Sequence, residues 1–510
     1  MALRQRTPDR RALPLRLARG AFFAFIHRMD PFFHLDATAQ ADLVRRGEAH
    51  PLELLDAAFA RIDALNPHIN AVTALFEKSA RRQAMQPVQG GPFAGVPYLI
   101  KDLAAVGGAA LTYGSRLFAN NVARRNEAIV RRALQAGFIL AGKTNTAEFG
   151  LLPTTEPLLH GATRNPWDLE RSPGGSSGGA AAAVAAGLVP VAQGGDGGGS
   201  IRIPASCCGV FGLKPSRGTV VPPLRRSPGD LSVNLCLSRS VRDTARQLCA
   251  CEADGGIEGL DARCVTGPSP RRLRIAFSTR TFLGTQAEPE VKAAIEDVAR
   301  LCESLGHHVE EAAPVLAGEE AVTHFLAFWA AGPAMLVKNF WLIRLKTWCA
   351  TAKANVLEPW TLGLADWFLA EERKGPGLML RAERFFEVVG RELDGFFDRY
   401  DVHLTPVLRR LPPRLGELAP TVPFETLLAR CVDHIAYTPL HNAVGTPAMS
   451  VPLSISPSGL PIGSQFAARR GDERTLLHLA YELEAAKPWA GRWPPLVAER
   501  IATGNAVAVT

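Results

Sequence analysis

Cysteine pairs of the kind that bind zinc or build a disulfide framework are missing from this sequence. Its 510 residues include nine cysteines, an odd number, and no CxxC pair. The spacing of Cys249 and Cys251 is not one that zinc sites use, while Cys207, Cys208 and Cys236 stand in apolar surroundings. We therefore expect buried free thiols in a reducing, cytoplasmic compartment, and neither a metal nor any other cofactor.

Long apolar runs are also missing. The most apolar segment, residues 324–348, is interrupted by Pro333, Lys338 and Asn339 and falls short of the roughly 18 apolar residues that a membrane span needs. The sequence therefore predicts no transmembrane segment. Residues 325–348 are compatible with three roles: protein core, the wall or lid of a substrate pocket, and an amphipathic surface that docks on a membrane. The sequence leaves all three open.

The sequence also gives no sign of a basic face that could bind a phosphate backbone. The formal net charge is +8, but residues 1–28 hold seven arginines and one aspartate, which leaves the rest of the chain nearly neutral. We therefore expect a small-molecule ligand and no nucleic acid. The apolar patch at residues 21–26 is too short for an export signal. We expect residues 1–28 to be disordered, or the natural chain to start at Met29.

What is present indicates a globular α/β protein. The hydrophobic fraction is 47% and the charged fraction 21%, as in proteins with a large core. Length alone predicts roughly two to four domains. Strand and helix patterns alternate along the chain, which favours a layered α/β fold. Strands are predicted up to Lys101 and over residues 138–141, 273–278, 448–454 and 462–468, and helices over 38–46, 52–65, 127–136, 288–305, 364–374, 385–399 and 473–485.

Glycine and serine concentrate in residues 172–218, where two glycine clusters flank an alanine-rich run of good helix propensity. Glycine serves where the backbone needs a positive φ or another group must approach closely. Serines among glycines at a helix start therefore expose a hydroxyl. The second cluster, from Asp196 to Ser200, offers several backbone N–H groups that converge on one point and suit an oxyanion. A flexible linker is the alternative, but the apolar sequence that follows favours packed chain.

A serine hydroxyl needs a base, and this stretch contains no histidine. The candidate base is Lys101, which follows a short apolar run and is predicted to emerge at a strand end. A lysine that is desolvated there can lose its proton near neutral pH and act as a base. An ordinary surface lysine at a strand end is the alternative, and the residues by themselves leave both open.

Lys101, the cluster GGSSGG at residues 174–179 and the cluster GGDGGGSIR at residues 194–202 resemble the amidase signature family of serine hydrolases. The spacings also fit, with 75 positions from Lys101 to Ser176 and 24 from Ser176 to Ser200. The resemblance implies a Ser–cisSer–Lys triad. Ser200 is then the nucleophile, Ser176 the bridging serine after a cis peptide bond at Gly175, and Lys101 the base.

The same resemblance implies roles for the residues around the triad. It places the oxyanion hole at the N–H groups of Gly197, Gly198 and Gly199 together with Ser200, assigns supporting positions to Ser177, Asp196 and Arg202, and begins the acyl-binding wall at Gly150 and Leu151. One position departs from the pattern: many members have threonine where this chain has Gly195. We expect a side-chain hydrogen bond to be missing there, without loss of activity.

Further family-like segments extend the resemblance over about residues 29–490, least recognisably between about 240 and 399. It implies the amidase signature fold, an α/β architecture in which a mixed central β-sheet is covered by helices on both sides. We prefer this single domain, residues 29–510, to the estimate from length. It would contain a signature core at about 86–236 and a variable substrate-pocket region at about 240–430. A homodimer is compatible with it.

Within the family, residues 196–218 are most similar to the bacterial cyclic-amide branch, which includes the aminohexanoate cyclic-dimer hydrolases. The resemblance thus implies an amidase that cleaves the C–N bond of a hydrophobic or cyclic carboxylic amide through an acyl-enzyme. The glutaminase subunit of the tRNA-dependent amidotransferase is an alternative, because it shares the signature and works with partner subunits.

Two other motif matches are weaker. Residues 174–178 match the GxSxG nucleophile elbow of α/β-hydrolase esterases, but a loop precedes them where that motif needs a strand, and His434 and His441 carry no further signal as its partners. Residues 137–144 match the nucleotide-binding P-loop pattern. Here a helix precedes the first glycine and an apolar strand lies between the glycines, so we expect no phosphate-binding loop.

Overall fold

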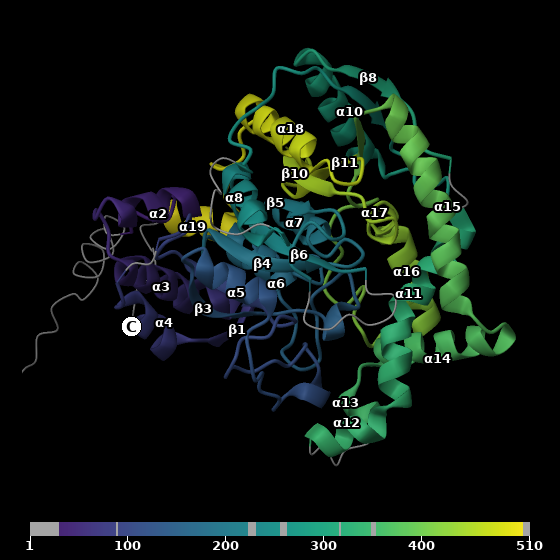
Figure 1. Ribbon diagram of the computed structural model, residues 1–510, viewed down its shortest axis with the longest axis horizontal. Coiled ribbons are helices and arrows are strands. Elements are labelled where there is room, and N and C mark those ends of the chain that lie inside the picture. The colour runs from purple at the N-terminus through teal and green to yellow at the C-terminus, as the bar shows by residue number, and fades with distance from the viewer. Residues whose placement is uncertain are drawn as a thin grey trace, which may run out of the picture.

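The computed structural model describes residues 30–87, 90–222, 231–254, 263–315, 318–347 and 353–502 (Figure 1). The predictions for residues 1–28 and for a start at Met29 lie outside these residues. A large mixed β-sheet flanked by helices forms the body of the protein, which confirms the predicted fold class.

The sheet has eleven strands in the order β1-β3-β2-β4-β6-β5-β10-β11-β9-β7-β8. The strands are β1 (Val72–Leu75), β2 (Pro97–Lys101), β3 (Ile139–Thr144), β4 (Val191–Asp196), β5 (Phe211–Lys214), β6 (Val233–Ser238), β7 (Arg274–Phe277), β8 (His308–Glu311), β9 (Val402–Pro406), β10 (Ala448–Ile455) and β11 (Pro461–Ala468). Strand β2 runs parallel to β3 and β4, and β7 runs parallel to β8 and β9, while the other pairs are antiparallel.

The parallel pairing of β2 with β4 brings the two signature segments together. Leu99 of β2 lies opposite Ala192 of β4, so both strands end at the same edge of the sheet, β2 at Lys101 and β4 at Asp196. Every residue of β2 is buried, as expected for an apolar strand inside a parallel segment. The predicted strand end at Lys101 is therefore confirmed.

Two short helices begin one or two residues after the candidate serines, which lie in the turns before them. Helices α6 (Gly178–Ala185) and α7 (Arg202–Cys208) pack against each other, α6 also against β4 and α7 against β5, β10 and β11. All residues of both helices are buried. The small alanine and glycine side chains of α6 permit this close packing, and a helix that is apolar on all sides belongs in a core.

The remaining helices around the sheet are α2 (Ala37–Arg45), α3 (Pro51–Ile69), α4 (Glu77–Ala84), α5 (Ala128–Gln135), α8 (Val241–Cys251), α10 (Pro289–Ser304), α18 (Glu473–Ala486) and α19 (Pro495–Ala502), with 3-10 turns η1 (Arg116–Phe118) and η2 (Glu148–Gly150). Helices α2, α3, α5, α10 and α18 largely match the predicted ranges, whereas no range was predicted for α4, α8 and α19. Strand β3 covers three of the four residues between the glycines of the P-loop pattern, Ile139 to Ala141, and α5 precedes them. The expectation of a strand in place of a phosphate-binding loop is confirmed.

A group of helices stands beside the sheet, seen in green at the right of Figure 1. It consists of α11 (Gly318–Lys338), α12 (Phe340–Thr347), α13 (Lys353–Val356), α14 (Pro359–Lys374), α15 (Leu378–Arg399), α16 (Phe424–His434) and α17 (Pro439–Ala443). Helix α11 packs against α14 and α15.

Helix α11 differs from one expectation. The sequence analysis expected Pro333 and Lys338 to leave the apolar stretch too short for a membrane span, but α11 is continuous over 21 residues through Pro333 and ends at Lys338. A proline removes one backbone hydrogen bond from a helix, and packing against two neighbouring helices supports α11 across that point. By length and composition alone α11 would suit a membrane span. In the structure it packs on α14 and α15 and contributes to the site described next.

Candidate active site

The amine of Lys101 is enclosed at the end of β2. The side chain is 1% exposed, and Nζ lies 2.8 Å from Ser176 Oγ, 2.8 Å from Ser177 Oγ and 3.5 Å from the Gly195 carbonyl oxygen. Burial lowers the pKa of Lys101 to about 7, against the opposing charge of Asp196. A large fraction of the amine is therefore neutral near pH 7, and the alternative of a surface lysine is excluded.

Ser176 stands in the loop that leads into α6. The peptide bond between Gly175 and Ser176 is cis, as the resemblance implied. Glycine is required before it, because a Cβ at Gly175 would lie 2.3 Å from the Thr154 carbonyl oxygen. Ser177 follows, and its hydroxyl donates to the Gly195 carbonyl at 3.1 Å. The two neighbouring hydroxyls thus approach the same amine from two directions.

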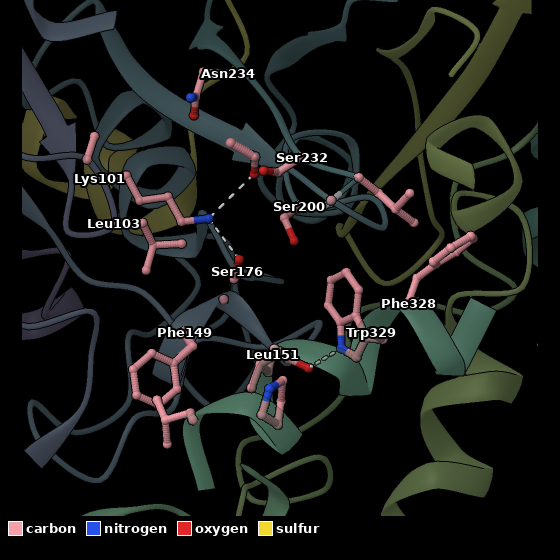
Figure 2. Close-up of a pocket in the computed structure, with 18 of the residues that line it drawn as sticks. Lys101, Leu103, Phe149, Leu151, Ser176, Ser200, Ser232, Asn234, Phe328 and Trp329 are labelled. Carbon is pink, nitrogen blue, oxygen red and sulfur yellow. Dashed lines mark hydrogen bonds between the residues drawn. The ribbon is translucent and has the colours of Figure 1, made fainter. Parts of the chain in front are cut away.

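Ser200 lies between the end of β4 and the start of α7. Figure 2 shows it between Lys101 and Ser176 on one side and Trp329 on the other. Its carbonyl accepts a hydrogen bond from the Ser177 N–H at 3.3 Å, which ties the two serine loops together. Lys101, Ser176 and Ser200, predicted as a set, line the same cavity.

The glycine turn before Ser200 differs from the predicted oxyanion hole in one of its backbone N–H donors. The Gly199 N–H donates to Asp196 Oδ1 at 2.7 Å, so it is already engaged and is not a free oxyanion donor. An oxyanion hole in this turn would use Gly197, Gly198 and the Ser200 N–H. Gly199 has a φ of +129°, and a Cβ there would lie 2.3 Å from Thr438 Oγ1, so the position requires glycine.

Asp196 and Arg202 form the buried ion pair that holds this turn. Arg202 Nε donates to Asp196 Oδ2 at 2.9 Å, and neither side chain is exposed. The Arg202 charge holds the pKa of Asp196 well below its usual range, against the effect of burial. Asp196 also accepts from the Ile201 N–H and from Asn442 Nδ2, and Arg202 donates to the Thr438 carbonyl and to Gln465 Oε1. Asp196 and Arg202 thus connect the turn to residues 438, 442 and 465 through buried hydrogen bonds.

The cavity in front of the three residues has a volume of about 560 Å³, a size typical of small-molecule sites. Gly150 and Leu151, at which the resemblance begins the acyl-binding wall, both line it. A Cβ at Gly150 would lie 3.1 Å from Ser176 Oγ. Helix α11 forms the opposite wall with Phe328, Trp329, Gly332, Pro333, Met335 and Leu336. Of residues 325–348, several between 328 and 343 contribute to the cavity wall, while Leu326, Ala327 and Ala330 are buried in the core, so the stretch serves as both wall and core.

The sequence analysis missed the aromatic residues that hold this wall. Trp329 Nε1 and Trp360 Nε1 both donate to the Leu151 carbonyl, at 3.1 and 3.0 Å. Thr438 donates to the Gly198 carbonyl at 2.7 Å. Thr438 and Asn442 stood in a segment noted for its family likeness, but Trp329 and Trp360 carried no sequence signal beyond an apolar neighbourhood.

The GxSxG interpretation gains no support. Residues 173–177 form a loop, and no strand immediately precedes Ser176, so the GxSxG interpretation lacks its strand. Burial lowers the pKa of His434 to about 3 and that of His441 well below its usual value, and neither residue lines the cavity. The eight cysteines that the structure describes are buried and form no disulfide with one another, as predicted.

Comparison with known proteins gives a consistent result. A model of the family described as Amidase matches residues 53–477. The AmiC protein of Mycobacterium tuberculosis is 38% identical over 474 residues, which cover 92% of this chain and 98% of that protein. The 6-aminohexanoate-cyclic-dimer hydrolase of Paenarthrobacter ureafaciens is 36% identical over 501 residues, covering 91% and 97%. A solved structure of 6-aminohexanoate cyclic dimer hydrolase superimposes with a TM-score of 0.81 at 35% identity, covering 91% of this chain and 99% of that one.

Proposed function

The chain belongs to the amidase signature family and is an amidase, and from this premise we propose that it cleaves carboxylic amides through an acyl-enzyme formed on Ser200. Ser176 relays the proton and Lys101 is the base. The observation that carries the proposal is the buried Lys101 amine, with a pKa of about 7, placed 2.8 Å from Ser176 Oγ beside the cavity that Ser200 lines.

Acylation begins with attack of Ser200 Oγ on the amide carbonyl carbon. The Ser200 proton passes to Ser176 Oγ while the Ser176 proton passes to the neutral Lys101 amine. Ser176 Oγ is hydrogen-bonded to Lys101 and to no other hydroxyl among the described residues, so substrate binding has to bring Ser200 within reach of it. The oxyanion then accepts hydrogen bonds from the Gly197, Gly198 and Ser200 N–H groups, each worth about 3 kcal/mol in the transition state.

The same relay runs in reverse to release the amine. The proton on Lys101 returns through Ser176 to the amide nitrogen, the C–N bond breaks, and the acyl group remains as an ester on Ser200. Water then attacks this ester and gives up a proton to Ser176 and Lys101, and Ser200 regains its proton as the carboxylic acid leaves. The net reaction consumes one amide and one water.

A hydrophobic or cyclic amide is the proposed substrate. The cavity takes apolar side chains from α11 and from Phe149 and Leu151, and the polar residues that line it outside the triad include a single acidic side chain and no basic one: Glu127, Gln193, Ser232, Asn234 and Asn339. The 36% identical relative is named for hydrolysis of a cyclic dimer of 6-aminohexanoate. Both observations support an uncharged amide of low polarity.

The test is to incubate the purified chain with linear, aryl and cyclic amides and with glutamine, and to measure amine release. We expect the wild type to hydrolyse at least one uncharged amide, Ser200→Ala to abolish turnover, and Ser304→Ala, on an exposed helix end, to leave it unchanged. Turnover of glutamine alone, or of nothing until a partner subunit is added, would favour the amidotransferase alternative. Wild-type rates in Ser200→Ala would remove the nucleophile assignment.

A further inference from the structure

A second buried lysine lies in the strand next to the base. Lys143 of β3 pairs with Ile100 of β2, one position before the pair of Lys101 and Thr144. Its side chain is 1% exposed. Lys143 is also the lysine of the P-loop pattern, and because β3 replaces the phosphate-binding loop, that pattern leaves its role unexplained. A lysine this deeply buried needs partners, since an isolated ammonium is costly to bury.

Among the described residues, the Lys143 amine contacts only hydrogen-bond acceptors. Nζ lies 3.1 Å from Asp102 Oδ1, 2.6 Å from the Ala104 carbonyl oxygen and 3.4 Å from the Lys101 carbonyl oxygen. Three acceptors suit an ammonium group, which has three N–H donors and accepts no hydrogen bond. Burial lowers the pKa of Lys143, and the Asp102 carboxylate opposes this effect. Lys143 is therefore the cation of a buried ion pair.

The amine of Lys101 has different partners. It lies 2.8 Å from the hydroxyls of Ser176 and Ser177 and 3.5 Å from the Gly195 carbonyl. A serine hydroxyl can donate as well as accept, so Ser176 can bond the neutral amine as readily as the ammonium. The two buried lysines of adjacent strands thus differ in the protonation state that their partners favour, and only Lys101 is placed to act as a base.

The Lys143 ion pair closes the turn that follows the base. The chain turns over residues 101–104, where the N–H of the last residue donates to the carbonyl of the first at 3.0 Å. Lys143 contacts the carbonyls of both these residues. Asp102 lies within the turn, and its Oδ2 accepts from the Thr112 N–H at 3.1 Å and from the Thr112 hydroxyl. The turn is therefore held from two sides.

The same turn forms part of the cavity wall. Leu103 and Ala104 line the cavity together with Lys101, and Figure 2 shows Leu103 beside Lys101. The next N–H along the chain, that of Ala105, donates to Glu127 Oε2 at 3.1 Å. A shift of the turn would therefore move the base and the wall of the cavity together.

We propose that Lys143 is the positioning residue of the base, and that its ion pair with Asp102 and its bonds to the turn keep the Lys101 amine enclosed beside Ser176. This inference rests on the proposed function, because it takes Lys101 as the base. Asp196 supplies the main charge that acts on the Lys101 amine, so Lys143 acts through the backbone. Without these contacts, water reaches the Lys101 amine and its pKa rises towards the ordinary value.

The test measures how fast a fluorophosphonate labels Ser200 between pH 5 and pH 10, which requires no known amide substrate. In the wild type the rate should rise through a midpoint of about pH 7. Lys143→Met keeps a flexible side chain of similar length and removes the charge. We expect it to lower the plateau rate about 10²-fold through a misplaced base, and to raise the midpoint by about one pH unit or more.

Two further variants separate positioning from a general loss of stability. Ile139→Ala removes a buried side chain from the same strand as Lys143, so it should lower Tm and leave the midpoint unchanged. Asp102→Asn leaves Lys143 its two carbonyl partners, so the plateau rate should fall only about fivefold, with a smaller shift of the midpoint in the same direction. If Lys143→Met does not fold, Asp102→Asn decides, and an unchanged rate and midpoint would overturn the inference.

The outcomes separate this inference from the proposed function. If the wild type is labelled at Ser200 and Lys143→Met has the same midpoint, the positioning role alone fails, because a merely structural role lowers the rate without moving the midpoint. If the wild type is not labelled at Ser200, the nucleophile assignment fails and the inference fails with it. Circular dichroism at each pH checks that every variant is folded.

Discussion

At the scale of single residues, burial determines the chemistry of Lys101. A lysine at an exposed strand end stays protonated at neutral pH, whereas the enclosed amine has its pKa lowered to about 7. Asp196 is the main charge that opposes this shift, and its own charge is engaged by Arg202. The arrangement therefore supplies a neutral amine where a serine hydroxyl needs a base.

The pH profile should report this amine. If neutral Lys101 is the base, kcat/KM for an uncharged amide rises about tenfold per pH unit below pH 7 and levels off above it, because only the deprotonated enzyme reacts. Initial rates between pH 5 and pH 9 give this pH dependence of kcat/KM. Circular dichroism at each pH checks that the fold persists. A flat profile through pH 7 would contradict a lysine base with this pKa.

The two serines beside Lys101 should differ in importance. Both hydroxyls lie 2.8 Å from Nζ, but Ser176 lines the cavity while Ser177 donates to the Gly195 carbonyl. We expect Ser176→Ala to lower kcat by about 10³-fold or more, and Ser177→Ala to lower it by about tenfold through a less well-placed amine. Steady-state kinetics of both variants on one amide measure the two effects. Equal losses of kcat in the two variants would contradict separate roles for the two serines.

At the scale of elements, Glu148 connects the η2 segment of the cavity wall to the helices beside the sheet. It is the first residue of η2, two positions before the wall residue Gly150. Its carboxylate accepts from the Glu358 N–H at 2.9 Å, from Thr361 Oγ1 at 2.5 Å and from Ser115 Oγ at 2.6 Å. It therefore caps the start of α14, the helix against which α11 and its Trp329 pack.

Removing this carboxylate should loosen the wall. Glu148→Ala leaves buried donors without an acceptor, and we expect a loss of about 2–3 kcal/mol in the free energy of unfolding together with lower activity. Urea denaturation measures the stability. The control is Glu371→Ala at the exposed end of α14, where the carboxylate pairs with Lys374 and should contribute less than about 1 kcal/mol. Equal effects of the two substitutions would contradict the coupling.

At the scale of the whole molecule, the Asp196–Arg202 pair joins parts of the chain that are far apart in sequence. Through Thr438, Asn442 and Gln465 it connects the end of β4 and the start of α7 to α17 and β11. The paired strands β10 and β11 complete the middle of the sheet on the other side of β5. The geometry of the glycine turn therefore depends on the assembly of the entire sheet.

Breaking this pair should destabilise the whole fold. Asp196→Ala leaves the fully buried Arg202 guanidinium without its counter-charge, and we expect about 3–5 kcal/mol less stability. Asp42→Ala, which removes the partner of Arg45 in a pair exposed on both sides, should cost less than about 1 kcal/mol. Chemical denaturation of both variants provides the measurement. A loss below about 1 kcal/mol for Asp196→Ala would contradict a central structural role.

The sequence was informative where spacing and backbone chemistry determine the structure. Lys101 at a strand end, the cis bond before Ser176 and the small residues of α6 follow from local patterns and the family likeness. The Trp329 wall did not, because its role comes from a contact with Leu151 across 178 positions, and an apolar stretch is equally compatible with core or pocket. The engagement of Gly199 by Asp196 was missed as well, because a glycine-rich sequence does not show which N–H groups are already bonded.

The central claim is that Ser200 forms the acyl-enzyme, and covalent labelling tests it most directly. The purified protein is treated with a serine-reactive fluorophosphonate, and its intact mass and peptides are analysed by mass spectrometry. We predict one adduct per chain, mapped to Ser200, absent from Ser200→Ala, and formed more slowly below pH 7. An adduct on another residue, or equal labelling of Ser200→Ala, would contradict the claim.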